Sequence, residues 1–172
     1  VTIHTYSFGC DQKPWNDCKS FADFRRTALL HHNIPEENAI FVDCKNLLHL
    51  GRYGESHCGT HWEMLAKAVQ DGGGFAEVCA DTAQRIRNAV QAGCSVLHVL
   101  FFCNWGKHRS VATSLLLSDA MAGSGTFATV HAPRHICMQA WSRRKCGWAR
   151  CDGCDNPFQL AKPSFRKVAT MW

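Results

Sequence analysis

The 172-residue sequence has no apolar run approaching the ~20 residues that a membrane-spanning helix needs. Residues 95–103 come nearest, but this run is too short and is typical of a buried strand. No charged-then-apolar secretory segment opens the chain. Internal repeats, low-complexity segments and a Gly-x-x-x-x-Gly-Lys-Ser/Thr motif are also absent, and the last absence excludes a Walker-type nucleotide site. We therefore expect a globular protein that has no membrane partner.

Cysteine, in contrast, is abundant. The eleven cysteines are an odd number and are spread along the whole sequence. A secreted disulfide scaffold is usually shorter and has an even number of cysteines. We therefore expect reduced thiols and a location in the cytoplasm or another reducing intracellular compartment. The length suits one compact domain with a sizeable core.

The positive charge is concentrated near the C-terminus. Residues 131–172 carry 8 Lys and Arg against 2 Asp, whereas residues 1–130 carry 11 Lys and Arg against 12 Asp and Glu. Clustered basic residues interleaved with Trp141, Trp148 and Phe165 favour a nucleic-acid backbone as partner. A solvated basic tail is the alternative. The candidate RNA-binding residues are Arg134, Arg143, Arg144, Lys145 and Arg150.

Predicted strands alternate with predicted helices, which indicates an α/β domain with a mainly parallel sheet flanked by helices. The predicted strands are 1–8, 39–44, 95–103 and 126–131, and the predicted helices are 21–32, 60–69, 75–92 and 110–122. After Pro133 the pattern weakens, and we expect loops and a small Cys-rich basic C-terminal element. Sites in such folds lie beyond the carboxyl ends of the strands, where Cys103 is expected.

The most informative segment joins a predicted strand to a predicted helix between Cys103 and Ser110. A tight loop followed by a helix N-terminus directs backbone N–H groups and the helix dipole toward one point, which favours an anion. Lys107 and Arg109 add positive charge at this point. The segment therefore predicts an anion-binding loop.

Cys103-x5-Arg109-Ser110 also resembles the signature of cysteine-dependent phosphatases, in particular the dual-specificity phosphatases. In this interpretation the Cys103 thiolate attacks phosphorus, Arg109 grips the phosphate and Ser110 assists departure of the thiolate. The resemblance implies an upstream aspartate as general acid, for which Asp71 has suitable spacing and Asp81 is second. The histidine that usually precedes the cysteine is a phenylalanine here.

Three motifs, in order, resemble the C-terminal domain of the RapZ family. They are Ser-Phe-Gly at residues 7–9, Phe-Val-Asp-Cys-Lys-Asn-Leu at 41–47 and Gly-Lys-His-Arg-Ser-Val at 106–111. The resemblance covers residues 1–136, within which 10–38 looks like an insertion. Residues 137–172 then form a basic, Cys-rich extension.

The RapZ resemblance implies a regulatory domain that binds small RNA and senses an amino-sugar phosphate. The residues that match the family's site, together with their loop neighbours, are Asp43, Ser95, Cys103, Asn104, Gly106, Lys107, His108, Arg109 and Ser110. Asp43 would accept hydrogen bonds from the sugar, and Arg109 would bind the phosphate. Trp105 stands where the family has glycine, which narrows the pocket.

A second cluster suggests zinc. Cys146, Cys151 and Cys154 fall within nine residues, and Cys137 or His135 would complete a tetrahedral site. Three unpaired thiols are the alternative, and no other cofactor is indicated. Cys58 also lies close in sequence to three histidines, but their spacing matches no familiar closed metal site, so we interpret them as loop polarity: His49, His57 and His61.

We therefore expect a domain that binds a phosphorylated small molecule, such as a phosphosugar, and RNA. The alternatives are a cysteine-dependent phosphatase and an interaction module that retains a degenerate anion pocket. Whether the chain is an enzyme, and whether it forms a homo-oligomer, stay open at this point.

Overall fold

In the computed structural model, residues 1–12, 15–47, 57–70, 74–136 and 151–172 are described. Within them, five strands form one parallel sheet, with the order β2-β3-β1-β4 and with β5 pairing farther along β1. The strands are β1 (Thr2–Gly9), β2 (Ala39–Asp43), β3 (Val96–Cys103), β4 (Thr129–Val130) and β5 (Arg134–His135). The predicted α/β class with a mainly parallel sheet is confirmed.

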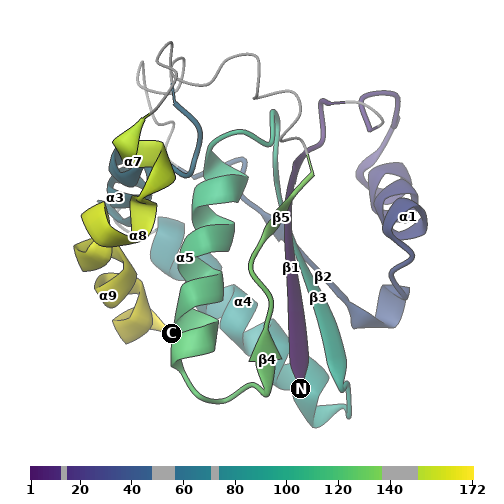
Figure 1. Cartoon of the computed structure of the whole chain (residues 1–172). Helices are drawn as coiled ribbons and strands as arrows, with labels where there is room; N and C mark the ends of the chain where they lie inside the picture. The colour runs from purple at the N-terminus through teal and green to yellow at the C-terminus, as the bar shows by residue number, and fades with distance from the viewer. Residues whose placement is uncertain (13–14, 48–56, 71–73, 137–150) are drawn as a thin grey trace.

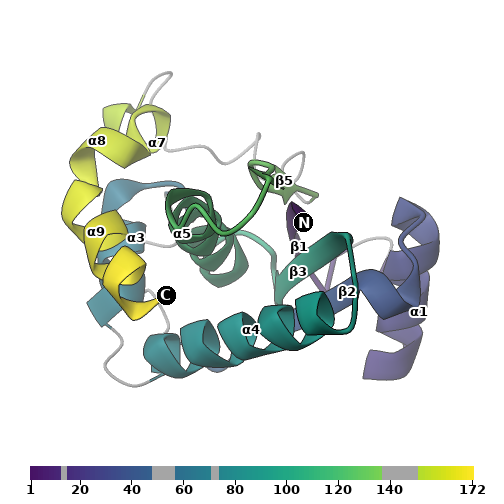
Figure 2. The same cartoon turned by 90° about the horizontal axis from the view of Figure 1, so that it is seen from below.

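Helices cover both faces of the sheet (Figures 1 and 2). Helix α1 lies on one face, and α4 and α5 lie on the other, where α3 and α9 pack beside α5. The helices are α1 (Phe21–His32), α3 (Trp62–Gln70), α4 (Gly74–Gln91), α5 (Arg109–Gly123), α7 (Asp152–Asp155), α8 (Pro157–Leu160) and α9 (Lys162–Met171), with a 3₁₀ turn η1 (Glu36–Asn38). Two-sided coverage explains why the last five residues of both β1 and β3 are buried.

Local sequence signals set the bounds of α1. The Ser20 hydroxyl accepts a hydrogen bond from the Asp23 backbone N–H at 3.1 Å, which caps the helix N-terminus. Asn33 ends the helix in the left-handed conformation, with φ of 57°. Helix α1 and the turn before it bring Phe24 and Trp15 into the core of the domain. Residues 10–38, which look like an insertion in the RapZ comparison, therefore contribute to the main core.

The C-terminal segment was expected to form loops and a small element, and residues 157–171 are more regular than that, because they are largely helical. Helix α9 packs against α5 and α3. Phe165 and Val168 of this helix, and Ala161 at its N-cap, belong to the common core. Their i, i+4, i+7 spacing is a helical signal that the Pro and Gly residues nearby obscured. The described part of the 137–172 extension therefore shares one core with residues 1–136.

Strand 126–131 is also shorter than expected. Only Thr129 and Val130 pair with β1, and the chain then returns to β1 at Arg134. Among the described residues, no helix has the length and apolar character needed to cross a membrane.

Candidate functional site

Three adjacent strands end together at one edge of the sheet, the upper edge in Figure 1. Gly9 of β1 lies opposite Cys103 of β3, and Asp43 of β2 lies opposite Phe102. Asp43 and the segment that begins at Cys103 are therefore brought together. Ser95 is not, because it precedes β3 at the other edge, about 25 Å of extended strand away.

A close backbone contact fixes the loop that follows β3. A Cβ atom on Gly106 would lie 2.3 Å from the Gly9 backbone nitrogen, and one on Gly9 would lie 2.4 Å from the Trp105 carbonyl carbon. Gly106 also has a φ of 62°, which side chains disfavour. The Cys10 and Asp11 N–H groups extend the pairing of β1 by donating to the carbonyls of the first two loop residues, each at 2.9 Å. The two glycines therefore set the shape of the loop.

Cys103 is buried at the base of this loop. Its Sγ atom lies 3.2 Å from the Ser110 Oγ atom, at the start of α5. The Ser110 hydroxyl also lies 3.3 Å from the Phe8 carbonyl oxygen, to which it donates. The thiol and the hydroxyl therefore lie side by side beneath the loop.

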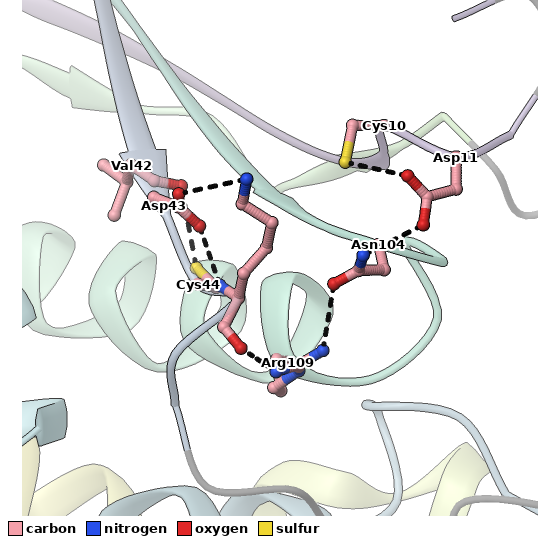
Figure 3. A network of polar contacts seen from close by, with 8 residues as sticks. Cys10, Asp11, Val42, Asp43, Cys44, Asn104 and Arg109 are labelled. Atoms are coloured by element: carbon pink, nitrogen blue, oxygen red, sulfur yellow. Dashed lines mark hydrogen bonds and ion pairs between the residues drawn. The ribbon is translucent and has the colours of Figure 1, made fainter. Parts of the chain in front are cut away.

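Arg109 is the central cation of the site (Figure 3). Its guanidinium donates to the Lys45 and Leu47 carbonyls and lies 3.4 Å from the Asn104 Oδ1 atom. The Asn104 amide in turn donates to the Asp11 carboxylate at 2.9 Å. Among the described residues, no carboxylate forms an ion pair with Arg109. The half-buried guanidinium is thus held by neutral groups.

Backbone donors accompany this charge at the start of α5. The helix has no side-chain cap and no acidic residue in its first turn. Within the described chain, the backbone N–H groups of Trp105, Gly106 and Arg109 have no hydrogen-bond partner. The Trp105 side chain is 66% exposed. The electrostatics of the loop therefore favour an anion.

The two residues before this helix start, Lys107 and His108, contact a neighbouring turn. The Gly59 N–H donates to the Lys107 carbonyl at 2.7 Å, and the His108 Nε2 atom lies 3.0 Å from the His57 carbonyl oxygen. The turn at 57–61 therefore supports the loop from outside.

Asp43 lies in a cleft of about 640 Å³ that opens beside the loop. Its carboxylate accepts a hydrogen bond from the Lys45 backbone N–H at 2.8 Å and pairs with the Lys45 ammonium at 3.5 Å. Arg25, Arg85 and Phe102 also line the cleft. Because the Lys45 carbonyl binds Arg109, residues 43–45 connect the cleft to the loop.

The proposed general acids differ in position. Asp81 lines the same cleft from α4 and pairs with Arg85 at 3.5 Å. Asp71 lies outside the described residues.

Two further cysteines lie at this edge, Cys10 and Cys44, and were not predicted to belong to the site although each directly follows a strand. Burial, followed by the Asp11 carboxylate, raises the pKa of Cys10 to about 11. Burial also raises the pKa of Cys44, which is fully enclosed. Both thiols are therefore protonated near neutral pH. In the described part of the chain no disulfide joins the cysteines.

A second group of polar side chains gathers where α7 meets the 57–61 turn. The His57 Nδ1 atom lies 3.8 Å from Cys151 Sγ and 3.9 Å from Cys154 Sγ. Hydrogen bonds from Cys154 and Thr60 lower the pKa of Cys58 to about 6. The sequence predicted no metal site at His57 and Cys58, because only the fold brings them to the Cys-x2-Cys segment.

The other predicted zinc ligands are placed elsewhere or lie outside the description. His135 is in β5, where its Nδ1 atom lies 2.7 Å from the Ser7 hydroxyl. Cys137 and Cys146 lie outside the described residues.

Of the predicted RNA-binding residues, the structure describes Arg134. Its guanidinium carbon lies 5.9 Å from the centre of the Tyr6 ring, on β1. The remaining four lie outside the described residues: Arg143, Arg144, Lys145 and Arg150.

No family model matches the chain, and no curated protein or solved structure matches it either.

Proposed function

We propose that the 103–110 loop binds the phosphate group of a small molecule. The observation that carries this proposal is the half-buried Arg109 guanidinium, which no described carboxylate neutralises and which lies at an uncapped helix N-terminus. A buried cation without a counter-ion is unfavourable, and a bound phosphate would supply the missing charge. The unpartnered N–H groups of the loop would donate to the remaining phosphate oxygens.

The neighbouring cleft suits the rest of the ligand. Asp43 and Lys45 present a carboxylate and an ammonium group at the end of β2, the strand next to β3. Hydroxyl or amine groups of a sugar would bind them. Phe102 forms an apolar wall, over which the Lys45 ammonium lies at 5.5 Å. A phosphosugar therefore matches the cleft and the loop together, in agreement with the RapZ resemblance.

Thermal unfolding with a panel of phosphosugars, free sugars and inorganic phosphate tests this proposal. A ligand that binds only the folded state raises the melting temperature. We expect a phosphosugar to stabilise the wild type more than its free sugar does. Arg109→Ala should remove this difference, whereas Arg26→Ala, which removes an exposed cation on α1, should preserve it.

An adjacent contact favours a second candidate function, phosphoryl transfer to Cys103. The Ser110 hydroxyl lies 3.2 Å from the thiol, and rotation of its O–H from the Phe8 carbonyl toward the sulfur would supply a donor that stabilises a thiolate. In this mechanism the Cys103 thiolate attacks phosphorus as the P–O bond to the alcohol breaks, and the departing oxygen takes a proton from a general acid or from water. Water then cleaves the S–P bond, which releases inorganic phosphate and restores the thiolate.

Hydrolysis of an aryl phosphate separates the two candidates. Turnover that is lost in both Cys103→Ser and Arg109→Ala would support the phosphatase. Phosphosugar stabilisation without turnover, retained in Cys103→Ser, would support binding alone.

We also propose that the basic C-terminal segment, residues 131–172, binds RNA. The charge of residues 131–172 supports it, with 8 Lys and Arg against 2 Asp.

A further inference from the structure

Two segments that are distant in sequence place three metal-ligating side chains together, where α7 meets the turn that supports the 103–110 loop. Cys151 and Cys154 flank the first turn of α7, and His57 comes from the turn before α3. One ligand atom from each residue lies within 4.8 Å of the other two. This is the one such group in the described part of the chain. About ninety-five positions separate the partners in sequence, so the fold brings them together.

The distances suit a tetrahedral ion. With Zn–S bonds of about 2.3 Å and Zn–N bonds of about 2.0 Å, sulfur and nitrogen ligands lie about 3.5 Å apart. The His57 Nδ1 atom lies 3.8 Å and 3.9 Å from the two sulfur atoms. Shifts of a few tenths of an ångström would therefore bring the His57 nitrogen to that distance from both sulfur atoms, and all three ligand atoms already lie within 4.8 Å of one another.

The fourth ligand is available next to His57. The Cys58 thiol interacts with the Cys154 thiol and lies 2.8 Å from the Thr60 hydroxyl. Three thiolates and one imidazole form a donor set that zinc takes in structural sites.

The surrounding packing holds the two segments against each other. The His57 and His61 rings lie 3.9 Å apart between centroids. A Cβ atom on Gly153 would lie 2.3 Å from the His61 Nε2 atom, so the Cys-x2-Cys turn approaches this imidazole as closely as only glycine permits. The approach of the two segments is therefore a specific feature of this sequence.

We propose that His57, Cys58, Cys151 and Cys154 bind one structural zinc ion. This ligand set differs from the one expected from sequence, which drew all its members from the C-terminal segment. The ion would attach α7 to the 57–61 turn and thereby anchor the C-terminal helices to the domain. The site does not depend on phosphate binding, so failure of either proposal leaves the other standing.

Metal analysis of the full chain, purified without chelator, tests the proposal. We expect about one zinc per chain in the wild type, and a ratio close to zero in Cys154→Ser and in His57→Gln. Cys94→Ser is the matched control, because Cys94 is a half-buried cysteine beyond the C-terminus of α4, outside the cluster. It should retain the metal. Folded wild-type protein without zinc that takes up none on addition would overturn the proposal.

Cobalt substitution in the wild type keeps the test independent of variant folding. Tetrahedral Co²⁺ bound by thiolates gives strong visible bands and a sulfur-to-metal charge-transfer band. Three thiolates predict that Cys58→Ser lowers the charge-transfer band by about a third. Absence of these bands in the wild type would contradict the site, and an unchanged band in folded Cys58→Ser would contradict the proposed ligand set.

Discussion

At the scale of single residues, the candidate phosphate site depends on two glycines and one arginine. Gly9 and Gly106 let two backbones approach to a distance that any side chain would prevent. This contact places the loop directly beyond the end of β1 and leaves Arg109 to reach the carbonyls of residues 45 and 47. The position of the Arg109 charge therefore depends on two uncharged glycines.

Replacement of Gly106 by alanine should destabilise the protein more than the same change at Gly125. Both glycines have positive φ, at 62° and 66°, so both variants carry the backbone cost of about 1 kcal/mol. Nothing lies within 4 Å of a Cβ atom at Gly125, whereas one at Gly106 collides with Gly9. We expect Gly106→Ala to lower the free energy of unfolding by more than about 2 kcal/mol in urea denaturation. Equal losses in the two variants would show that the close contact is absent.

At the scale of elements, the strands and the central helices were largely predictable, because their signals are local. The Ser20 cap and Asn33 mark both ends of α1, and the apolar run before Cys103 marks β3. Strands β4 and β5 are short and separate because each pairs with a different part of β1. Their bounds are therefore set by the tertiary structure and not by the local sequence. Helix α9 was missed because its three apolar positions follow a Gly- and Pro-rich segment.

The candidate site likewise has parts that are predictable from local sequence and parts that are not. The strand–loop–helix segment that contains Cys103 and Arg109 is local, and so is its placement at the carboxyl edge. The meeting of His57 with Cys151 is not, because about ninety-five positions separate them and no spacing rule connects them. Ser95 was assigned by resemblance alone, and the length of β3 places it at the opposite edge.

Helix α9 should contribute measurably to the stability of the whole domain. Phe165 is buried against the common core, and its loss leaves a cavity between helices. We expect Phe165→Ala to lower the free energy of unfolding by about 3 kcal/mol in urea denaturation. Arg166→Ala, at the exposed neighbouring position, should change it by less than about 0.5 kcal/mol. A Phe165→Ala effect as small as this control would mean that α9 is not docked.

At the scale of the whole molecule, two half-buried histidines predict loss of stability in acid. Burial lowers the pKa of His135 to about 4, and burial, followed by the charges of His31 and Arg134, lowers the pKa of His32 to about 4. The unfolded chain titrates near 6.5, so between about 4 and 6.5 it binds protons that the folded state does not. Stability therefore rises with pH across this window and is lost as pH falls through it.

Thermal unfolding between pH 5 and 6.5, above the range in which ordinary carboxylates titrate, measures this effect. We expect the melting temperature to fall steadily as the pH is lowered, and His135→Gln to make the fall shallower. A melting temperature that is constant over this range would contradict the assignment of neutral, half-buried imidazoles.

The uneven charge of the molecule predicts salt-dependent RNA binding. If the basic C-terminal segment neutralises RNA phosphates, the logarithm of the association constant falls linearly with the logarithm of the salt concentration, with a slope of about −0.7 per phosphate for single strands. Fluorescence anisotropy with a labelled RNA measures this slope. Affinity that is undetectable at low salt, or that does not change with salt, would contradict RNA binding.

Isothermal titration of the wild type with a phosphosugar at low ionic strength tests the central claim most directly, with Arg109→Ala as the comparison. Loss of the charged hydrogen bonds to phosphate costs about 1.5–3 kcal/mol, so we predict saturable binding at one site that weakens at least tenfold in the variant. Saturable binding of equal strength to the two proteins, or no binding of any phosphosugar to the wild type, would contradict the assignment of this loop as a phosphate site.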